Sequence, residues 1–327
     1  MVIFWEDKMK NETDECLKDE WKKKFFRTYF GIDADKETLN KCLDYKNEHI
    51  PDSLFKYSKV KNVISLLSDD LMFLPKIEDL NDPFECNIFY DLDIVLGKFI
   101  DNLDKFVDYS KFDDEIISEN ESLFISEFLK QPFIESFEKI LLDLEDNFKN
   151  KTSIICLSED YCIAPMWAHY ADNHKGVCIE YDFKNVSNFM FEILCFPIEY
   201  VEEADNTFEL SALFDDNIKT NPNWPLRLVL RKSHNWKYEK EWRIIVSQFI
   251  KDFFYEKSHG SMYFDEYYSD NHYIKFIKPK SVYLGMDIEL KDEEKLIDIC
   301  KFRKINVYKM KKDKLGYNLK SEPIVEF

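Results

Sequence analysis

The spacing of apolar residues changes twice along the chain, and each change predicts a change of secondary structure. Short runs that alternate or are continuously apolar lie on both sides of residues 91–149 and predict β-strands. Two of them precede that segment, SLFKYS at 53–58 and LMFLP at 71–75. The runs that follow it are TSIICLS, GVCIEYDF, FEILCFPIEYV, EWRIIVSQF, YIKFI, SVYLGM and INVYKM.

Residues 91–149 carry a helical spacing instead. One apolar stripe includes Leu96, Phe99 and Leu103, and a second includes Phe133 and Phe137. The charged residues 1–50 favour short helices. We therefore expect an α+β protein with a mixed or split, mostly antiparallel sheet. We expect an N-terminal helical arm (1–50) followed by a single α/β domain (51–327) of the kind that carries a catalytic site. Its helical insertion (91–150) is expected to lie outside the sheet.

The composition agrees with a folded protein and excludes two common nucleotide sites. The chain has 327 residues, 45% of them hydrophobic and 16% aromatic, which is enough for a sizeable core. Its six glycines are widely scattered, so neither G-x-G-x-x-G nor G-x-x-x-x-G-K-[ST] occurs. A dinucleotide site of the Rossmann type and a P-loop are therefore excluded.

The net charge of the chain limits the classes of molecule that it is expected to bind. A formal net charge of −19 repels nucleic acid over most of the surface, so we expect no non-specific nucleic-acid binding. The sequence has no apolar run long enough to span a bilayer and no apolar export segment near residue 1, so we expect no membrane contact. The eight cysteines form no C-x-x-C pair, which is typical of reduced thiols. The expected location is the cytoplasm.

MWAHYADNHKG (166–176) places four polar-tipped rings in a short stretch. Pro165 favours the start of a helix over 165–174, and Gly176 favours its end in the left-handed conformation. Met166 and Trp167 are predicted to pack in the core. For His169, Tyr170 and His174, a core position and a cleft-facing position remain alternatives, because a buried polar-tipped ring needs a hydrogen-bond partner.

The same stretch raises two chemical alternatives. His169 and His174 are five positions apart and do not share a helix face, and the nearby cysteines follow no zinc spacing, so no metal is expected. A nucleophilic pair is the other alternative, with Cys162 or Cys178 as the thiolate and His169 as the base. The apolar strand around Cys178 predicts that this thiol is buried.

Three motifs carry a family resemblance. MWAHYADNHKGVCIEYD, with NDPFE (81–85) before it and WKYEKEWRII (236–245) after it, resembles the bacterial family called domain of unknown function 2971. The family name implies no activity. NDPFE is typical of a turn, in which Asn81 or Asp82 is expected to cap a helix and Glu85 to close the floor of a cleft.

LFKYS, then CLSED with MWAHY, then YEKEWRII also show a remoter similarity to ADP-ribosyltransferase folds. That resemblance implies NAD as co-substrate, Glu241 as the catalytic residue that opens a strand, and Glu239 as the second acidic residue. The candidate residues for substrate binding are Lys56, Tyr57, Asn81, Asp82, Glu85, Ser158, Trp167, His169, Tyr170 and His174. Among them the flat rings of Tyr57, Trp167 and Tyr170 would sandwich the nicotinamide. Lys56, Arg231 or Lys232 would meet the diphosphate. Two departures are plain, since Lys56–Tyr57 stands where the fold has His or Arg and no S-T-S triplet follows the second strand.

The chemistry gives Glu241 a purpose in this hypothesis. Cleavage of the nicotinamide–ribose bond passes through an oxocarbenium-like transition state, which a carboxylate stabilises. The expected function is thus an NAD-dependent ADP-ribosyltransferase or NAD-consuming effector, of the kind found among bacterial toxins and anti-phage defence proteins. Its partners would be a small-molecule nucleotide and a macromolecular acceptor that the sequence does not identify.

Other functions remain open. Glu241 is alternatively a structural partner of Arg243, and the protein a non-catalytic module that binds a ligand or a partner. A hydrolase or nuclease that uses His169 with Glu85, Asp172 or Glu241 is the third hypothesis.

Overall fold

The computed structural model describes residues 20–106, 119–183, 194–221, 223–247 and 273–327. The chain divides into two compact units, each built from three separate segments. Unit 1 comprises residues 1–39, 81–150 and 201–233, and unit 2 comprises residues 40–80, 151–200 and 234–327. Unit 1 therefore contains the whole of the predicted helical insertion, and unit 2 contains most of the predicted strands.

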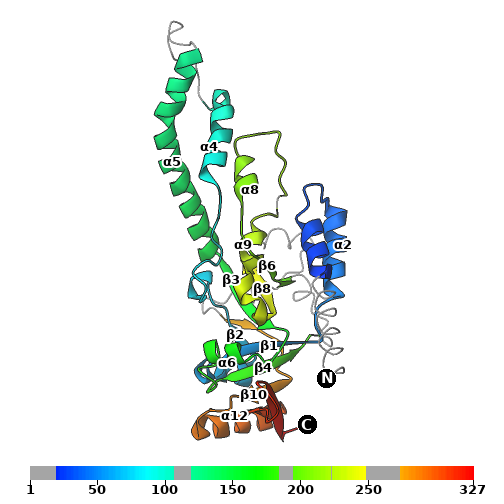
Figure 1. Ribbon diagram of the computed structural model, residues 1–327. Coiled ribbons are helices and arrows are strands. Elements are labelled where there is room, and N and C mark those ends of the chain that lie inside the picture. Colours follow the sequence, from blue (N-terminus) through cyan, green and yellow to red (C-terminus); the bar gives the residue numbers. More distant parts are fainter. Residues whose placement is uncertain (1–19, 107–118, 184–193, 222, 248–272) are drawn as a thin grey trace. The chain divides into compact units, whose positions relative to one another are not determined.

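Unit 2 is built on an eight-stranded sheet with the order β12-β11-β10-β4-β1-β3-β8-β5 (Figure 1). All its described pairings are antiparallel except β10 with β11. This confirms the prediction of an α+β protein with a mostly antiparallel sheet. The strands are β1 (Ser53–Ser58), β3 (Thr152–Ser158), β4 (Val177–Asp182), β5 (Cys195–Pro197), β8 (Glu241–Ser247), β10 (Ser281–Leu284), β11 (Asn306–Lys312) and β12 (Leu319–Val325).

The apolar runs located these strands because they supply the sheet's buried residues. β12 is the exception, since it is an edge strand without a continuous apolar run and it contains Pro323, so its pattern gave no signal. A separate two-stranded sheet pairs β2 (Leu71–Phe73) with β9 (Tyr273–Lys275).

Short helices accompany the sheet of unit 2. They are η1 (Val60–Asn62), α3 (Ile64–Asp69), η2 (Ile77–Asp79), α6 (Ala164–His169), η5 (His234–Glu239) and α12 (Leu290–Arg303). α2 (Lys36–Asn47) runs from one unit into the other, and its residue Lys46 is fully buried in unit 2. The Lys46 ammonium donates to the Cys195 carbonyl oxygen at 2.7 Å and lies 4.8 Å from the centre of the Phe196 ring. This contact covers the edge strand β5 and occupies one of its backbone acceptors.

Unit 1 is mainly helical. Its elements are a helix over 20–29, α4 (Leu92–Asp101), η3 (Leu103–Lys105), α5 (Glu119–Asn150), α8 (Thr207–Ser211), α9 (Leu226–Leu230) and β7 (Arg231–Ser233), with β6 (Glu199–Val201) at its boundary. α4 and α5 lie side by side (Figure 1). Phe133 stacks on Phe99 at 4.0 Å and on Phe137 at 5.3 Å, and Phe214 meets all three rings edge-on. The two predicted apolar stripes thus form one aromatic core, and the helices of 91–150 contribute no strand to the sheet.

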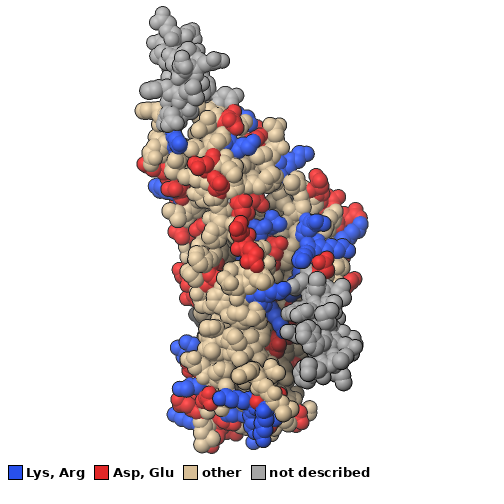
Figure 2. Space-filling view, viewed as in Figure 1, with Lys and Arg blue, Asp and Glu red and all other residues tan. Residues whose placement is uncertain are grey.

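Charged side chains of both signs are interspersed over the face shown in Figure 2. Lys and Arg gather near α12 and the β11–β12 hairpin, where Asp313 is the single acidic residue between Lys301 and Lys320. Some of these cations are paired, as Lys309 is with Glu293 at 2.6 Å.

No helix among the described residues combines the length and the apolar composition that crossing a membrane requires.

The carboxylate of Glu180 on β4 is the centre of a buried polar network in unit 2. It accepts from Lys280 Nζ at 2.7 Å, from Ser53 Oγ at 2.8 Å and from the Tyr283 hydroxyl at 3.1 Å. Burial acts to raise the pKa of Glu180, but hydrogen bonds from Lys280, Ser53 and Ser281, with the charge of Lys280, outweigh burial and lower it below 4.5.

We expect Lys280→Met to lower stability in a pH-dependent way. Because the pKa of Glu180 is depressed in the folded protein, its stabilising contribution is present above 4.5 and is lost as the pH falls through the depressed value. The difference in unfolding free energy between the native protein and Lys280→Met should therefore be largest near neutral pH and shrink in acid. Urea unfolding at several pH values measures it, with the exposed Lys278→Met as the control. A difference that grows in acid contradicts this assignment.

Candidate functional site

Three strands that carry the sequence motifs are neighbours in unit 2. In the order β1-β3-β8, Phe55 pairs with Ser158 and Ser158 pairs with Glu241. Directly paired residues present their side chains to the same face of a sheet. Phe55, Ser158 and Glu241 therefore form a row across three strands, which we call the transverse row.

The segment that links β3 to β4 covers the neighbouring part of this face, beside β1 and β4 (Figure 1). α6 begins with Pro165 in its first turn, and its residues Met166 and Trp167 are buried, as predicted. Trp167 donates its indole N–H to the Tyr161 carbonyl at 2.8 Å and meets the Tyr57 ring edge-on at 5.4 Å. The Tyr57 hydroxyl donates to the Asp160 carbonyl at 2.8 Å. Tyr57 and Trp167, two of the three aromatic rings expected to hold nicotinamide, thus belong to the core of this unit.

The prediction of a helix over 165–174 is wrong at its end. α6 stops at His169, and Asp172, Asn173 and His174 all adopt the left-handed conformation, with φ of 49°, 50° and 67°. Gly176 is not the left-handed residue. Its place is fixed by close packing, because a Cβ there would lie 2.3 Å from the Ser58 carbonyl oxygen.

The left-handed turn (residues 172–174) is held from both sides. Its amide groups donate back to the carbonyls of residues 167 and 168, as in His174 N–H to Trp167 O at 3.1 Å. The His174 carbonyl accepts from Asp287 N–H at 3.1 Å, next to β10. Left-handed non-glycine residues are strained and persist only where surrounding contacts hold them. The crowded motif is therefore, in large part, a fixed connection between strands.

The three other rings of the motif differ in their surroundings. Tyr170 is half-buried, and its hydroxyl donates to Glu239 Oε1 at 2.6 Å. His169 is exposed, with its ring 6.3 Å from that of Tyr170. His174 is half-buried, and burial lowers its pKa, with Asp287 acting in the opposite direction. Tyr170 is thus the ring that reaches an acidic residue of the third motif.

The two acidic residues of that motif have separate partners. Arg243 donates to Glu241 through Nε at 2.8 Å and through Nη2 at 3.2 Å, and Arg243 is fully buried. Glu239 and Glu241 are each 2% exposed. Lys240 between them is left-handed, with φ of 48°, so the alternation of a strand does not extend back to Glu239. Glu241 is therefore a buried carboxylate paired with Arg243. A structural role and a catalytic role both remain alternatives for it.

Ser158 and Lys56 complete the surroundings of these carboxylates. The Ser158 hydroxyl donates to the Glu239 carbonyl oxygen at 2.7 Å. The Lys56 ammonium lies 3.5 Å from the Cys156 carbonyl oxygen. Burial lowers the pKa of Lys56, while the nearby Cys156 and Glu241 act to raise it. Ser158 and Tyr170 thus both contact Glu239, and Lys56 lies within electrostatic reach of Glu241. That Tyr57, His169, Tyr170 and Glu241 line one cleft stays a prediction.

The Cys162 and Cys178 thiols are poor nucleophiles. Burial raises the pKa of Cys162, and Asp160 raises it further. Cys178 is fully buried in β4, as predicted, and burial raises its pKa well above 9.0. Since the thiolate is the reactive form, these surroundings disfavour the cysteine–histidine pair.

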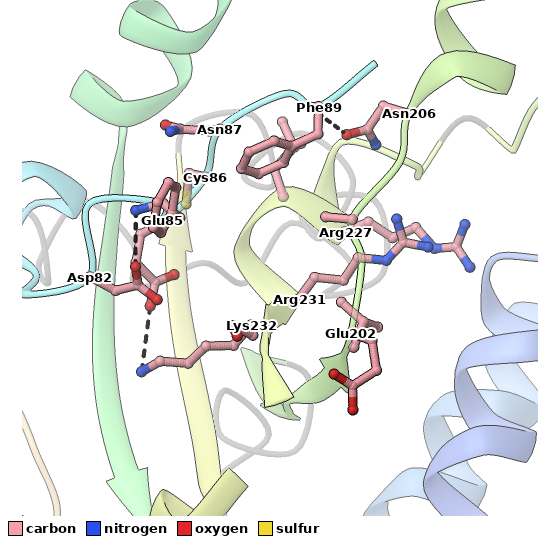
Figure 3. A pocket seen from close by; sticks show the side chains of 15 residues that line it. Asp82, Glu85, Cys86, Asn87, Phe89, Glu202, Asn206, Arg227, Arg231 and Lys232 are labelled. Carbon is pink, nitrogen blue, oxygen red and sulfur yellow. Dashed lines mark hydrogen bonds and ion pairs between the residues drawn. The ribbon is translucent and has the colours of Figure 1, made fainter. Parts of the chain in front are cut away.

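The NDPFE motif lies in unit 1 and forms a turn, as predicted, but it caps no helix. Asp82 is buried and accepts from Phe84 N–H at 2.9 Å, while α4 is capped by Asp91 instead. Asn81 is exposed. Glu85 faces Lys232 at 3.5 Å, and both line a pocket (Figure 3).

Some contacts of the site could be predicted from the sequence only weakly, and others could not be predicted at all. The Glu241–Arg243 pair follows from strand alternation, because residues two apart share a face. The Tyr200 hydroxyl accepts from Glu241 N–H at 2.8 Å. Tyr200 lies on another strand, and no sequence pattern predicted this contact. The same holds for Asp160, whose carboxylate pairs with Lys240 at 3.2 Å.

Within the described ranges, no group of three or more His, Cys, Asp and Glu side chains is arranged to hold a metal ion.

The family comparison covers the centre of the site. A family model described as protein of unknown function (DUF2971) matches residues 166–244. That stretch begins in α6 and ends in β8, so it includes the motif at Met166 and both Glu239 and Glu241, and it leaves out NDPFE. No curated protein and no solved structure matches the chain. Residues 166–244 therefore match the family called domain of unknown function 2971, which the sequence motif resembled.

Proposed function

We propose that unit 2 cleaves NAD and transfers ADP-ribose, with Glu241 as the catalytic residue and Glu239 as its helper. The observation that carries the proposal is the transverse row, in which Ser158 stands directly between Phe55 and Glu241 on adjacent strands. The three motifs that resemble an ADP-ribosyltransferase lie on these strands in the same order.

The reaction breaks the bond between the nicotinamide nitrogen and the ribose carbon. Nicotinamide leaves with the bonding electron pair, and an acceptor group or water forms the new bond to that carbon and loses a proton. Positive charge develops on the ribose in the transition state. A fixed carboxylate stabilises that charge more than it stabilises the neutral ribose, so Glu241 lowers the barrier.

The contacts around the two carboxylates support preorganisation. Arg243 fixes Glu241 through two hydrogen bonds, and Tyr170 fixes Glu239 through one. Groups held in place before the reaction do not need to reorient during it. In this proposal Glu239, one residue before the left-handed Lys240, positions the acceptor.

Glu241→Gln is expected to reduce nicotinamide release from NAD by about a hundredfold, equivalent to about 3 kcal/mol of transition-state stabilisation. The amide keeps hydrogen-bonding capacity and loses the negative charge. The assay follows nicotinamide release by the purified full chain, with and without cell extract as a source of acceptor. Glu239→Gln should reduce transfer to the acceptor more than it reduces hydrolysis.

Glu241→Asp is the control for folding, because it keeps a negative charge opposite Arg243. Thermal melting of each variant separates lost activity from lost structure. Unchanged nicotinamide release by a folded Glu241→Gln protein contradicts the catalytic role. Absence of nicotinamide release from the native protein with every acceptor source contradicts the proposed reaction.

A second candidate is a module that binds a ligand without turnover, and the burial of the carboxylates favours it. Glu239 and Glu241 are each 2% exposed and already bonded to protein groups. This candidate predicts nucleotide binding by ligand-detected NMR without nicotinamide release, which the first assay distinguishes.

A further inference from the structure

Unit 1 contains a pocket of about 210 Å³. Its walls come from residues 82–89, 201–206 and 227–233, which all belong to this unit (Figure 3). Phe84, Phe89 and Leu228 supply apolar wall, and Phe84 is 64% exposed. A large apolar side chain exposed at a pocket is typical of a surface that a ligand covers.

The walls are tied to each other by backbone contacts. Asn206 N–H donates to the Phe89 carbonyl at 2.6 Å, and Phe89 N–H donates to the Asn206 side-chain oxygen at 3.3 Å. The NDPFE turn is fixed by the bond from Phe84 N–H to Asp82. These hydrogen bonds fix the walls relative to one another, which lowers the entropy cost of binding.

A buried ion pair gives the pocket its polar character. Glu85 Oε1 lies 3.5 Å from Lys232 Nζ, and their side chains are 3% and 4% exposed. A carboxylate only accepts hydrogen bonds and an ammonium only donates them. The pair thus presents an acceptor and a donor side by side, beside apolar walls.

The cations of the pocket point to different sides. In Figure 3, Lys232 extends toward Glu85, whereas Arg231 and Arg227 extend to the opposite side. Arg231 donates to the Asp205 carbonyl at 3.3 Å, and Arg227 pairs with Glu209 at 3.5 Å. The three cations therefore do not converge on one anion, and Glu85 with Lys232 forms the charged pair on the other side of the pocket.

We propose that this pocket binds an amino-substituted nucleobase, with adenine as the type. Its exocyclic amine would donate to Glu85, the neighbouring ring nitrogen would accept from Lys232, and its flat faces would contact the Phe84 and Phe89 side. The size is suitable, because an apolar cavity of roughly 150 Å³ already takes benzene. The inference does not depend on the proposed reaction, since base binding requires no turnover of NAD.

Calorimetric titration of the full chain with adenosine and with purine riboside tests the pocket. Purine riboside lacks the exocyclic amine, so it should bind about tenfold more weakly, as expected for one lost charge-assisted hydrogen bond. Ala204→Phe, which fills the pocket from its wall, should abolish adenosine binding. Ala212→Phe, at a position of the same unit outside the lining, should leave binding unchanged.

The double variant Glu85→Leu/Lys232→Met tests the polar pair, and removing both charges together avoids leaving one buried charge alone. It should weaken adenosine binding and remove the preference over purine riboside. Its matched control is Lys105→Met/Asp216→Leu, an exposed pair of the same unit. Equal binding of the two nucleosides, adenosine binding that survives Ala204→Phe, or no nucleoside binding by the native protein overturns the proposal. Nicotinamide release is measured in a separate assay, so the proposed reaction and the proposed nucleobase pocket can be contradicted independently.

Discussion

Arg243→Met is expected to lower the free energy of unfolding by about 3–5 kcal/mol. The guanidinium is fully buried and makes two hydrogen bonds to Glu241, so its removal leaves a carboxylate that is 2% exposed without this partner. A buried charge without a counter-charge is far less favourable than the same charge in water. Urea unfolding followed by tryptophan fluorescence measures the loss, because Trp167 and Trp242 are fully buried in the same unit.

Arg303→Met is the matched control. Arg303 also makes two hydrogen bonds to one carboxylate, that of Asp70 at 2.7 and 2.8 Å, but both side chains are 18% exposed. Solvent reduces the penalty of an unpaired charge, so this variant should lose less stability. The double variant Arg243→Met/Glu241→Met should recover much of the loss. Equal losses for Arg243→Met and Arg303→Met contradict the view that burial makes the Glu241–Arg243 pair important.

Gly285→Ala is expected to lower the free energy of unfolding by about 3 kcal/mol or more. A Cβ at residue 285 would lie 2.0 Å from the His174 carbonyl oxygen and 2.8 Å from that of Gly176. Both are backbone atoms held in hydrogen bonds, so neither moves without disturbing the left-handed turn or the β4–β10 pairing. The same fluorescence measurement reports the change.

Gly97→Ala is the matched control, and we expect it to raise stability where Gly285→Ala lowers it. Gly97 lies inside α4, and a Cβ there meets nothing within 4 Å. Alanine favours helix over glycine by about 1 kcal/mol, so this variant should be slightly more stable than the native protein. A Gly285→Ala protein that is as stable as Gly97→Ala shows that the packing at residue 285 is not close.

The strands and helices were predictable where burial imposes a periodic pattern. β4 and β8 are buried along nearly their whole length, and their continuous apolar runs located them. The left-handed turn has no periodic pattern. Asp, Asn and His adopt this conformation more often than other non-glycine residues, but the contacts that hold Asp172, Asn173 and His174 there come from residues close and distant in the chain. The predicted helix over 165–174 therefore ended too late.

The candidate site could be predicted only in part. Apolar patterns locate strands but do not say which strands pair, so they suggest the neighbouring positions of Ser158 and Glu241 only indirectly. The partners of the two acidic residues depend on one backbone angle. With Lys240 in a strand conformation, Glu239 and Glu241 would share a face, whereas its left-handed conformation directs Glu239 to Tyr170. No propensity of lysine signals that angle.

The left-handed turn also constrains the order in which a newly synthesised chain can mature. Its last residue, His174, is held through Asp287 and lies against Gly285, which a ribosome adds only after β4, β8 and β9 have been made. A strained backbone without its supporting contacts relaxes to commoner angles. The most recognisable motif of the chain therefore reaches its final shape late, once β10 has docked beside β4.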